Sequence, residues 1–556
     1  MKAQRPVGLA LSWPRATSVF LTDVALLAAG SALPSRRAFW VAAAVAVVVT
    51  ALALVTVRRV SLLSAVFWGR VGVAAALDTA PGKAIDHRRR LGEGVVGIRE
   101  QRGLLVAVVA VDGPSHPPSV LDRHTVASAT MLPLNVVANA LRQFDIQLNN
   151  IDVVSVGSRR TLNAGHPYAP VYSAIVGDHA AVGQRRTWLV LRMDPQRNVS
   201  AVASRDSVAS TLAAAAERLA HELTTRRCAA HPLTAAQMDA ADSALLAGFT
   251  AAGARAGWRE IRHRGGYVTA FWLSPDDIGG ATLTRLWRPD TDATAVTVRL
   301  TPAASGGVCV ACWARYHTGA RLQEAPLLGL NRMSGRHLAA LRFGLPVPSA
   351  GSFDVPARAL GADEGLAAPI GPNGQLFGVT GRGLPMLLPL TAPTGHARVT
   401  VAAELPVLVQ LALRAAATGH YVIVCTSRPR QWSYASGPAL YVVAAMPESL
   451  PRCSLPVVLV CDGVAEPPPM PGVAVTVTTV AHGTASIADI HFEQDSASTM
   501  VVRTTEFQSR VHIDVASERR YLWVPEKVPS PPAVAGRWRR GTPVDGHVRE
   551  GSSARR

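Results

Sequence analysis

Two pairs of side chains have types and spacings that could perform chemistry. Cys309 and Cys312 are separated by two residues, the spacing of many metal-binding and redox-active cysteine pairs. Asp290 and Asp292 form an Asp-Thr-Asp sequence, and two carboxylates so close together can hold a divalent cation. In addition, glycines recur in residues 371–378 and 381–383, where backbone amides could approach a phosphate group. Catalysis would require other elements to bring acids, bases or further ligands to these groups.

The surrounding sequence favours a structural explanation for each group. No second cysteine pair completes a four-ligand zinc site, and Cys309 and Cys312 lie in a hydrophobic strand pattern, which indicates core packing. The acidic pair is similar to that of sugar-nucleotide transferases, but it precedes a predicted strand instead of following one, so a polar turn is favoured. The glycines are not followed by a helix and are typical of turns. We therefore predict no catalytic residue, no cofactor and no metal site.

The N-terminal region carries two apolar runs that predict a transmembrane hairpin. Residues 38–57 contain no charged side chain, and as a helix they would cover roughly 30 Å, the thickness of the hydrocarbon core of a bilayer. Phe39 and Trp40 stand at one end, where aromatic rings favour the headgroup level. Residues 17–34 are also long enough to cross. A cleavable signal peptide and an interfacial helix are the alternatives for this first run, but the tight turn between the runs favours two spans.

Asp23 is the unusual residue of the hairpin. A carboxylate that faces lipid is costly, so the side chain should face a partner helix or the membrane interface. A membrane-edge position and a polar contact inside an assembly are both compatible with the sequence.

Basic residues predict the orientation. The turn between the runs holds only Arg36 and Arg37, whereas the outer flanks carry Lys2, Arg5, Arg15, Arg58, Arg59, Arg70, Lys83, Arg88, Arg89 and Arg90. Because basic residues near span ends stay in the cytoplasm, both termini and the bulk of the chain should be cytoplasmic, in a multi-pass protein of the cell inner membrane. Arg58, Arg59 and Arg88 to Arg90 should then contact anionic lipid.

The overall charge does not predict nucleic-acid binding. The formal net charge is +18, but only three residues are lysine, which together with the abundant alanine indicates the codon bias of a high-GC genome. Binding to nucleic acid would favour aromatic side chains interleaved with a basic stripe, and the sequence has none. The six cysteines have scattered spacings, so we expect reduced thiols.

After the hairpin the patterns predict mixed α/β cytosolic domains with an antiparallel β section. Strands are expected at residues 103–113, 151–160 and 185–195, with helices at residues 133–144 and 207–227, the latter capped by Asp206. Thr234 and Gln237 have the spacing of a capping box for the next helix. An antiparallel meander should begin near Trp258, and a strand, helix and strand should follow from residue 399.

Composition divides the chain into seven segments. They are a cytoplasmic tail (1–16), the hairpin (17–57), a basic juxtamembrane segment (58–98), a first α/β region (99–345), a linker (346–370), a second α/β region (371–524) and a disordered basic tail (525–556).

Several separated passages resemble the EccE family, the E component of mycobacterial type VII (ESX) secretion systems. They are "PLNVVANALRQFDIQLNNIDVVSVGSRR", "RRTWLVLRMDPQRN", "LTAAQMDAA", "GWREIRHRGGYVTAFWLSPDDI", "GPNGQLFGVTGRGLPMLLPLT" and "VAAELPVLVQLALRAAATGHYVIVCTSRPRQW". The resemblance implies a structural subunit of the inner-membrane secretion complex, with the B, C and D membrane components as partners and no catalytic residues. The alternative is a membrane-anchored glycosyl- or acyltransferase acting on lipid-linked substrates.

Overall fold

The structure is a computed structural model in which only part of the chain is described. The described residues are 7–9, 13–32, 34–57, 60–61, 73–74, 82–90, 92, 94–101, 103–123, 125–128, 130–159, 168–304, 306–348, 353–393, 395–447, 450, 455–484, 487–514 and 518–522. Arg58, Arg59 and the predicted tail (525–556) lie outside these ranges.

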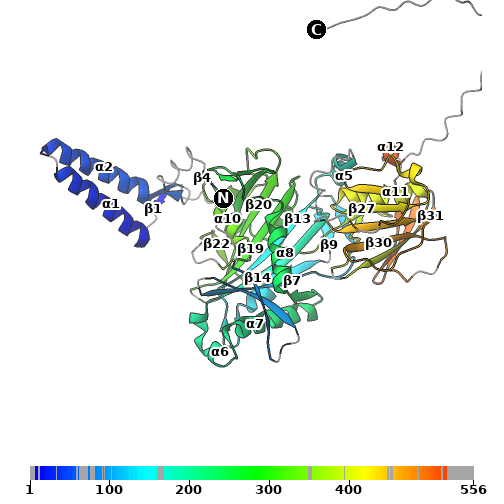
Figure 1. The fold of residues 1–556 in the computed structure, drawn as a ribbon, viewed down its shortest axis with the longest axis horizontal. Helices are drawn as coiled ribbons and strands as arrows, with labels where there is room; N and C mark the ends of the chain where they lie inside the picture. Colours follow the sequence, from blue (N-terminus) through cyan, green and yellow to red (C-terminus); the bar gives the residue numbers. More distant parts are fainter. Residues whose placement is uncertain are drawn as a thin grey trace, which may run out of the picture.

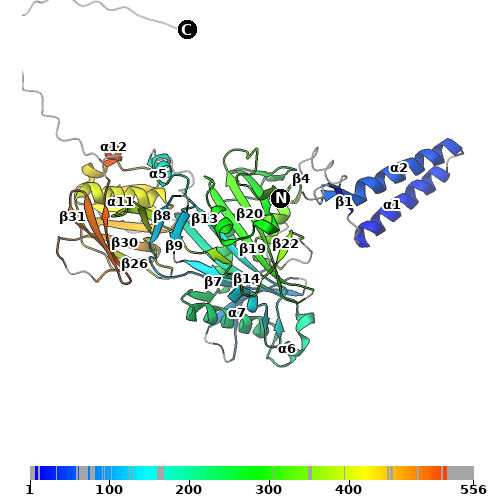
Figure 2. The same cartoon turned by 180° about the vertical axis from the view of Figure 1, so that it is seen from behind.

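A pair of helices projects from a body built on two large β-sheets (Figures 1 and 2). The pair consists of α1 (Trp13–Ser31) and α2 (Arg36–Leu54). The helix α2 is long and apolar enough to cross a membrane, whereas the apolar part of α1, Ala16–Ser31, is shorter. The strands β1 (Val7–Leu9) and β2 (Val55–Val57) pair antiparallel, and β2 also pairs with β3 (Val60–Ser61). The apolar run 38–57 therefore changes from helix to strand after Leu54.

The first sheet has fourteen strands within the described residues, and every pairing in it is antiparallel. Their order is β4 (Val73–Ala74), β16 (Arg255–Ala256), β17 (Ile261–His263), β18 (Gly266–Leu273), β20 (Val308–Thr318), β19 (Ala293–Pro302), β13 (Asn150–Ser158), β14 (Gln184–Met193), β7 (Leu104–Val111), β6 (Val95–Gln101) and β5 (Ile85–Arg88). Three short strands pair beside this path: β15 (Ala230–Pro232) on β7, β21 (Leu330–Arg332) on β18 and β22 (Ala357–Leu360) on β20. The antiparallel section is confirmed and includes the strands expected earlier in the chain.

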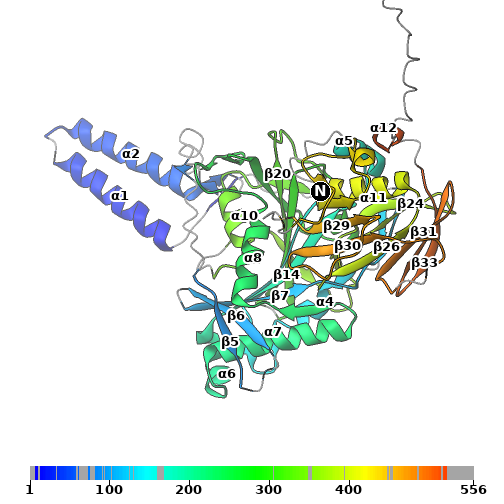
Figure 3. The ribbon, with the colours of Figure 1, turned by 45° about the vertical axis from the view of Figure 1, so that its right-hand side comes forward.

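Helices cover both faces of the first sheet (Figure 3). On β7, Leu105, Ala107 and Val109 pack in a core with α4 (Leu134–Asn139) and α7 (Val208–Thr225). The alternate residues, such as Val106 and Val108, pack with α8 (Ala235–Leu246) on the opposite face, as the two-residue period of a strand requires. On this second face α10 (His337–Phe343) contacts β18 and β20. The shorter helices near this sheet are α6 (Val199–Ala203) and α9 (Gly280–Arg285).

Two local predictions about helices were wrong and one was correct. The helix expected over 133–144 ends at Asn139, because the chain turns into a small hairpin of β11 (Arg142–Gln143) and β12 (Ile146–Gln147). The cap of α7 is Ser207, whose hydroxyl accepts from the N–H of Ser210, and not Asp206. The capping box of Thr234 and Gln237 is present.

The second sheet has twelve strands within the described residues. Their order is β28 (Leu440–Val443), β27 (Tyr421–Thr426), β29 (Val457–Asp462), β30 (Val473–Thr479), β26 (Ala397–Ala402), β31 (Ile490–Ser496), β32 (Thr499–Thr504), β33 (Gln508–His512), β24 (Gln375–Thr380), β25 (Pro385–Leu388), β8 (Ser119–Asp122) and β9 (Thr125–Ser128). The pairings from β28 to β31 are parallel and the remainder are antiparallel.

One long helix, α11 (Leu405–Ala417), packs on the second sheet beside α5 (Tyr168–Val176) and α12 (Arg519–Leu522). Below these helices Glu518 accepts bonds from Arg414 (2.6 Å) and from the hydroxyl of Tyr168 (2.7 Å), and all three side chains are buried. The helix α5 thus joins the C-terminal core although it lies early in the chain.

The two sheets exchange segments. The strands β8 and β9 come from the N-terminal part of the chain and pair onto β25 of the second sheet. Within residues 346–370, β22 pairs with β20, and β23 (Ala367–Pro369) pairs with β10 (Met131–Pro133). The segment expected as a linker therefore contributes two short strands to the first unit.

Buried neutral histidines should make the fold sensitive to acid. The N–H of Ala270 donates to Nδ1 of His337 (3.1 Å), so the ring proton sits on Nε2, which donates to the carbonyl of Trp258 (3.2 Å). Burial lowers the pKa of His337 to about 3 and that of His420 to about 4. The unfolded chain binds these protons below about pH 6.5. Stability from these groups is therefore complete above that pH and is lost as the pH falls toward the folded values.

We expect the free energy of unfolding of the protein to fall by about 2 kcal/mol for each of these histidines between about pH 7 and about pH 5. The readout is the thermal midpoint of the detergent-solubilised full-length protein at the two pH values. His337→Gln keeps an acceptor and a donor in place and should remove about a third of the pH dependence, because burial also lowers the pKa of His317, whereas the exposed His221→Gln should not change it. An unchanged slope in His337→Gln would show that His337 is not the group that titrates.

Candidate functional site

The two N-terminal helices pack through small residues. A Cβ placed on Gly30 would lie 2.5 Å from the Cβ of Ala42, so glycine at this position lets α1 and α2 approach closely. Ala46 of α2 is buried in the same interface. Small residues let helix backbones approach and gain dispersion contacts that lipid supplies less well.

Asp23 lies on the face of α1 that meets α2. Its Oδ2 accepts a hydrogen bond from the hydroxyl of Thr50 (2.6 Å). Its Oδ1 is buried and has no hydrogen-bond partner among the described residues. The sequence predicted that Asp23 needs a polar partner but did not identify Thr50, because that contact depends on how the two helices align.

The aromatic residues predicted for the membrane interface lie near the start of α2. The rings of Phe39 and Trp40 are both exposed and meet edge to face, with centroids 5.9 Å apart. Exposed rings at one end of an apolar helix are typical of the headgroup level of a bilayer.

Of the described arginines predicted to contact lipid, two are exposed and one is in an ion pair. Arg88 ends β5 and is exposed, as is Arg90, whereas Arg89 forms an ion pair with Glu217 of α7. In Figures 1 and 3, α7 lies well away from α1 and α2. Glu217 is 128 positions from Arg89, so no sequence pattern pointed to this pair.

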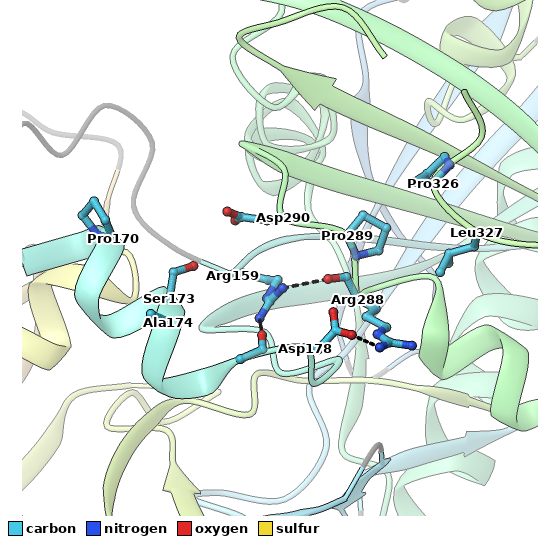
Figure 4. Close-up of a pocket in the computed structure, with 11 residues that line it drawn as sticks. Arg159, Pro170, Ser173, Ala174, Asp178, Arg288, Pro289, Asp290, Pro326 and Leu327 are labelled. Carbon is cyan, nitrogen blue, oxygen red and sulfur yellow. Dashed lines mark hydrogen bonds and ion pairs between the residues drawn. The ribbon is translucent and has the colours of Figure 1, made fainter. Parts of the chain in front are cut away.

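Figure 4 shows a cleft of about 660 Å³ between α5 and the turn that precedes β19. Arg159 lines the cleft and donates to the carbonyl oxygens of Arg288 (2.7 Å) and Gly177. Asp178 forms an ion pair with Arg288, and Asp290 reaches the cleft from the turn. Arg159, Asp178 and Arg288 bind one another or the backbone, so among the described residues these charged groups do not converge on an open position of the cleft.

The other residues singled out from the sequence do not come together. Cys309 and Cys312 are an odd number of positions apart on β20 and so point to opposite faces of the sheet, where one metal ion cannot reach both. Asp290 and Asp292 stand in the turn before β19, as expected for a polar turn. A Cβ on Gly374 would lie 2.1 Å from backbone atoms of Leu388 and Pro389, so this glycine serves a close chain crossing. Within the described residues no group of three or more histidine, cysteine or acidic side chains could hold a metal ion.

Comparison with known proteins gives a family and two closely similar relatives. Residues 181–273 match the family model described as "Putative type VII ESX secretion system translocon, EccE". The ESX-5 secretion system protein EccE5 of Mycobacterium marinum is 42% identical over 391 residues, which is 67% of this chain and 97% of the relative. The chain belongs to the EccE family. EccE5 of Mycobacterium tuberculosis is 44% identical over 394 residues, again 67% of this chain and 97% of the relative. The ESX-2 secretion system protein EccE2 of that species is 28% identical over 367 residues, which is 65% of this chain and 66% of the relative.

Membership of the EccE family confirms the resemblance found in the sequence. The predicted role as a structural subunit of a type VII secretion complex is confirmed with it, and nothing supports the transferase alternative. The EccE family is a family of secretion-system components, and the helix α2 is long enough to anchor such a component in the inner membrane.

Proposed function

We propose that this EccE protein is a membrane-anchored scaffold in which α1 and α2 are both spans and the body holds the translocation machinery from the cytosolic side. The observation that carries this proposal is the packing of α1 against α2 through Gly30, Ala42 and the Asp23–Thr50 bond. A helix lying on the membrane surface would not need a specific polar bond to a spanning neighbour. Two spans joined by a tight turn bury that bond away from lipid.

The arginine distribution supports cytoplasmic termini for the hairpin. We expect reporter fusions at residue 100 and at the C-terminus both to score as cytoplasmic, because the basic flanks resist translocation. Matched fusions of alkaline phosphatase and of a cytoplasmic reporter measure this directly. An active alkaline phosphatase at either position would contradict the hairpin.

The partners we propose are the B, C and D membrane components, together with anionic lipid. The buried Oδ1 of Asp23 has no hydrogen-bond partner in the part of the chain that the structure describes, which supports a contact with a donor on a neighbouring subunit, because an unsatisfied carboxylate oxygen is costly in a membrane. Arg58, Arg59, Arg88 and Arg90 remain our candidates for lipid contact. No role with nucleic acid is proposed.

We propose two cytosolic units that follow the two sheets. The first is the predicted region 99–345 extended by β22 and β23, and the second is the predicted region 371–524 extended by β8, β9 and α5. The exchanged segments should make the two units unfold together rather than separately.

We propose that the protein acts without catalysis. The contacts of Arg159 and the Asp178–Arg288 pair in the cleft, together with the separated Cys309 and Cys312, support this view over the transferase. Replacing Asp290 and Asp292 by alanine together, or Cys309 by serine with Cys312 by alanine, should leave secretion within about twofold of wild type. The measurement is the amount of exported substrate per cell, with protein abundance and complex recovery as controls. Loss of secretion at normal abundance and assembly would reveal a chemical site.

A further inference from the structure

The tip of the β11–β12 hairpin displays a bulky apolar ring to solvent. Phe144 is 84% exposed and adopts a left-handed backbone conformation with φ of 55°. Two-residue turns that need positive φ normally use glycine or asparagine, and a residue with a Cβ is strained there. Phe144 is therefore strained in its backbone, and its exposed side chain does not pack in the core.

The ring is presented on a rigid support. Asp145, the other turn residue, accepts two bonds of 2.7 Å each from Arg205. The side chain of Asn198 bonds both to the N–H of Gln147 (2.7 Å) and to its carbonyl (2.9 Å). Gln143 donates to the carbonyl of Ala215 on α7 (3.2 Å), which holds the hairpin against that helix. A fixed ring can contact a partner without the entropy loss of a loose loop.

Arginine side chains lie near the ring of Phe144. The guanidinium of Arg218 lies 5.3 Å from the ring centre of Phe144, and its Nη2 is buried without a hydrogen-bond partner among the described residues. Burial lowers the pKa of Arg218, and the nearby charges of Arg205 and Arg89 lower it further. Both carboxylates close by form ion pairs: Asp145 with Arg205, and Glu217 with Arg89 through Oε2, while Oε1 of Glu217 has no hydrogen-bond partner among the described residues. We define the Phe144 patch as Phe144, Asp145, Arg89, Arg142, Arg205, Glu217 and Arg218.

We propose that the Phe144 patch docks onto an acidic protein surface that has an apolar socket. The ring of Phe144 enters the socket, and carboxylates on the rim of the socket pair with the arginines of the patch. Aromatic residues and arginine are the side chains most enriched at the centres of protein interfaces. The patch has four arginines against two paired carboxylates, so an acidic partner is the complementary one.

A protein surface fits this patch better than a lipid surface does. The guanidinium of Arg218 lies 5.3 Å from the ring centre, so a socket with a carboxylate on its rim can contact both groups at once. In Figures 1 and 3 the α7 helix that bears Arg218 lies well away from the membrane hairpin. This inference does not rest on the contacts proposed for α1 and α2, and its failure would leave them standing.

The test places a photo-cross-linking benzoyl-phenylalanine at position 144 of the full-length protein in its native membrane. After irradiation we expect one dominant protein adduct, whose cross-linked peptide, identified by mass spectrometry, contains aspartate or glutamate. The same cross-linker at Leu328, which is 97% exposed and distant in sequence, should give a yield about tenfold lower or less. Phospholipid adducts as the main product, a yield no greater than at Leu328, or a peptide without acidic residues would each overturn the proposal.

Two matched variants separate docking from folding. Arg218→Glu should lower the adduct yield by about tenfold or more, while Arg226→Glu, on an exposed arginine at the end of the same helix, should not. With the cross-linker moved to the exposed Arg142, Phe144→Gly should lower the yield to a similar degree. Because glycine suits the positive φ, Phe144→Gly should fold at least as stably as wild type. An unchanged yield in either Arg218→Glu or Phe144→Gly would contradict the proposed contact.

Discussion

Asp152→Asn should destabilise the protein by about 3–5 kcal/mol, the cost of leaving buried charges without their partner. Asp152 is fully buried on β13 between two arginines of the neighbouring strands β14 and β19. Arg299 donates to both of its carboxylate oxygens, at 2.8 and 2.7 Å, and Arg192 forms the second ion pair. One carboxylate on β13 therefore forms ion pairs with both neighbouring strands, β14 and β19.

The electrostatic balance at Asp152 shows why asparagine cannot replace it. Burial alone would raise the pKa of this carboxyl, but the charges of Arg299 and Arg192 outweigh burial and hold the pKa below its usual value. Asparagine has the same shape but turns an NH₂ group toward guanidinium donors and leaves two positive charges uncompensated. Removing one partner from a buried ion-pair network leaves an uncompensated charge. The loss of folding free energy is therefore larger than if the whole network were replaced by packed apolar side chains.

The measurement is thermal unfolding of the detergent-solubilised full-length protein, where the loss corresponds to roughly 3–6 °C if the two units unfold together. Asp239→Asn is the matched control, since Asp239 is 71% exposed and its pair with Arg99 is 3.3 Å long. Such a pair should change stability by less than about 1 kcal/mol. If the two variants unfold at the same temperature, the buried network does not hold the first sheet together.

The local elements were well predicted because their signals are local. Buried strands such as β7 and β13 are continuous apolar runs, and the capping box of α8 is set by two residues three positions apart. The helix α11 begins after Glu404 and ends before Gly419, whose φ of 97° is typical of a glycine that ends a helix.

The exchange of segments between the sheets could not be predicted. The pairing of β8 with β25 joins residues more than 260 positions apart, and the short strand β8 carries no pattern that selects its partner. The helix predicted over residues 133–144 was too long for a related reason. Hydrophobic periodicity continues past Asn139, but the bond from Gln143 to α7 and the Asp145–Arg205 pair favour a turn there.

The candidate site was predicted in part. The need of Asp23 for a polar partner follows from the cost of a charge in lipid, whereas the identity of Thr50 depends on helix packing. The Phe144 patch gave no signal in the sequence, since a phenylalanine after an apolar run reads as part of a helix core. Only its backbone conformation and exposure distinguish it.

Exchange of the whole hairpin should have the largest functional effect. A mere tether makes no demand on side-chain identity, but a subunit interface does, because Asp23 and the small residues of α2 present specific contacts to a neighbouring helix. An unrelated hairpin of equal length in place of residues 17–57 should preserve membrane attachment and the folded cytosolic units. Recovery with the other membrane components, and secretion, should fall by about tenfold or more. Asp23→Leu should show a milder loss, since one interhelical polar contact contributes only about 0.6–2 kcal/mol.

The most direct test of the account is purification of the tagged protein in mild detergent, with its own hairpin and with the exchanged one. The amount of each co-purified ESX membrane component is measured by mass spectrometry and normalised to the tagged chain. Equal membrane abundance of the two proteins is the control. The account predicts that the B, C and D components accompany the natural protein and are largely lost from the exchanged one. Equal recovery and normal secretion with the exchanged hairpin would show that the helices only tether the protein and that the cytosolic units alone hold it in the complex.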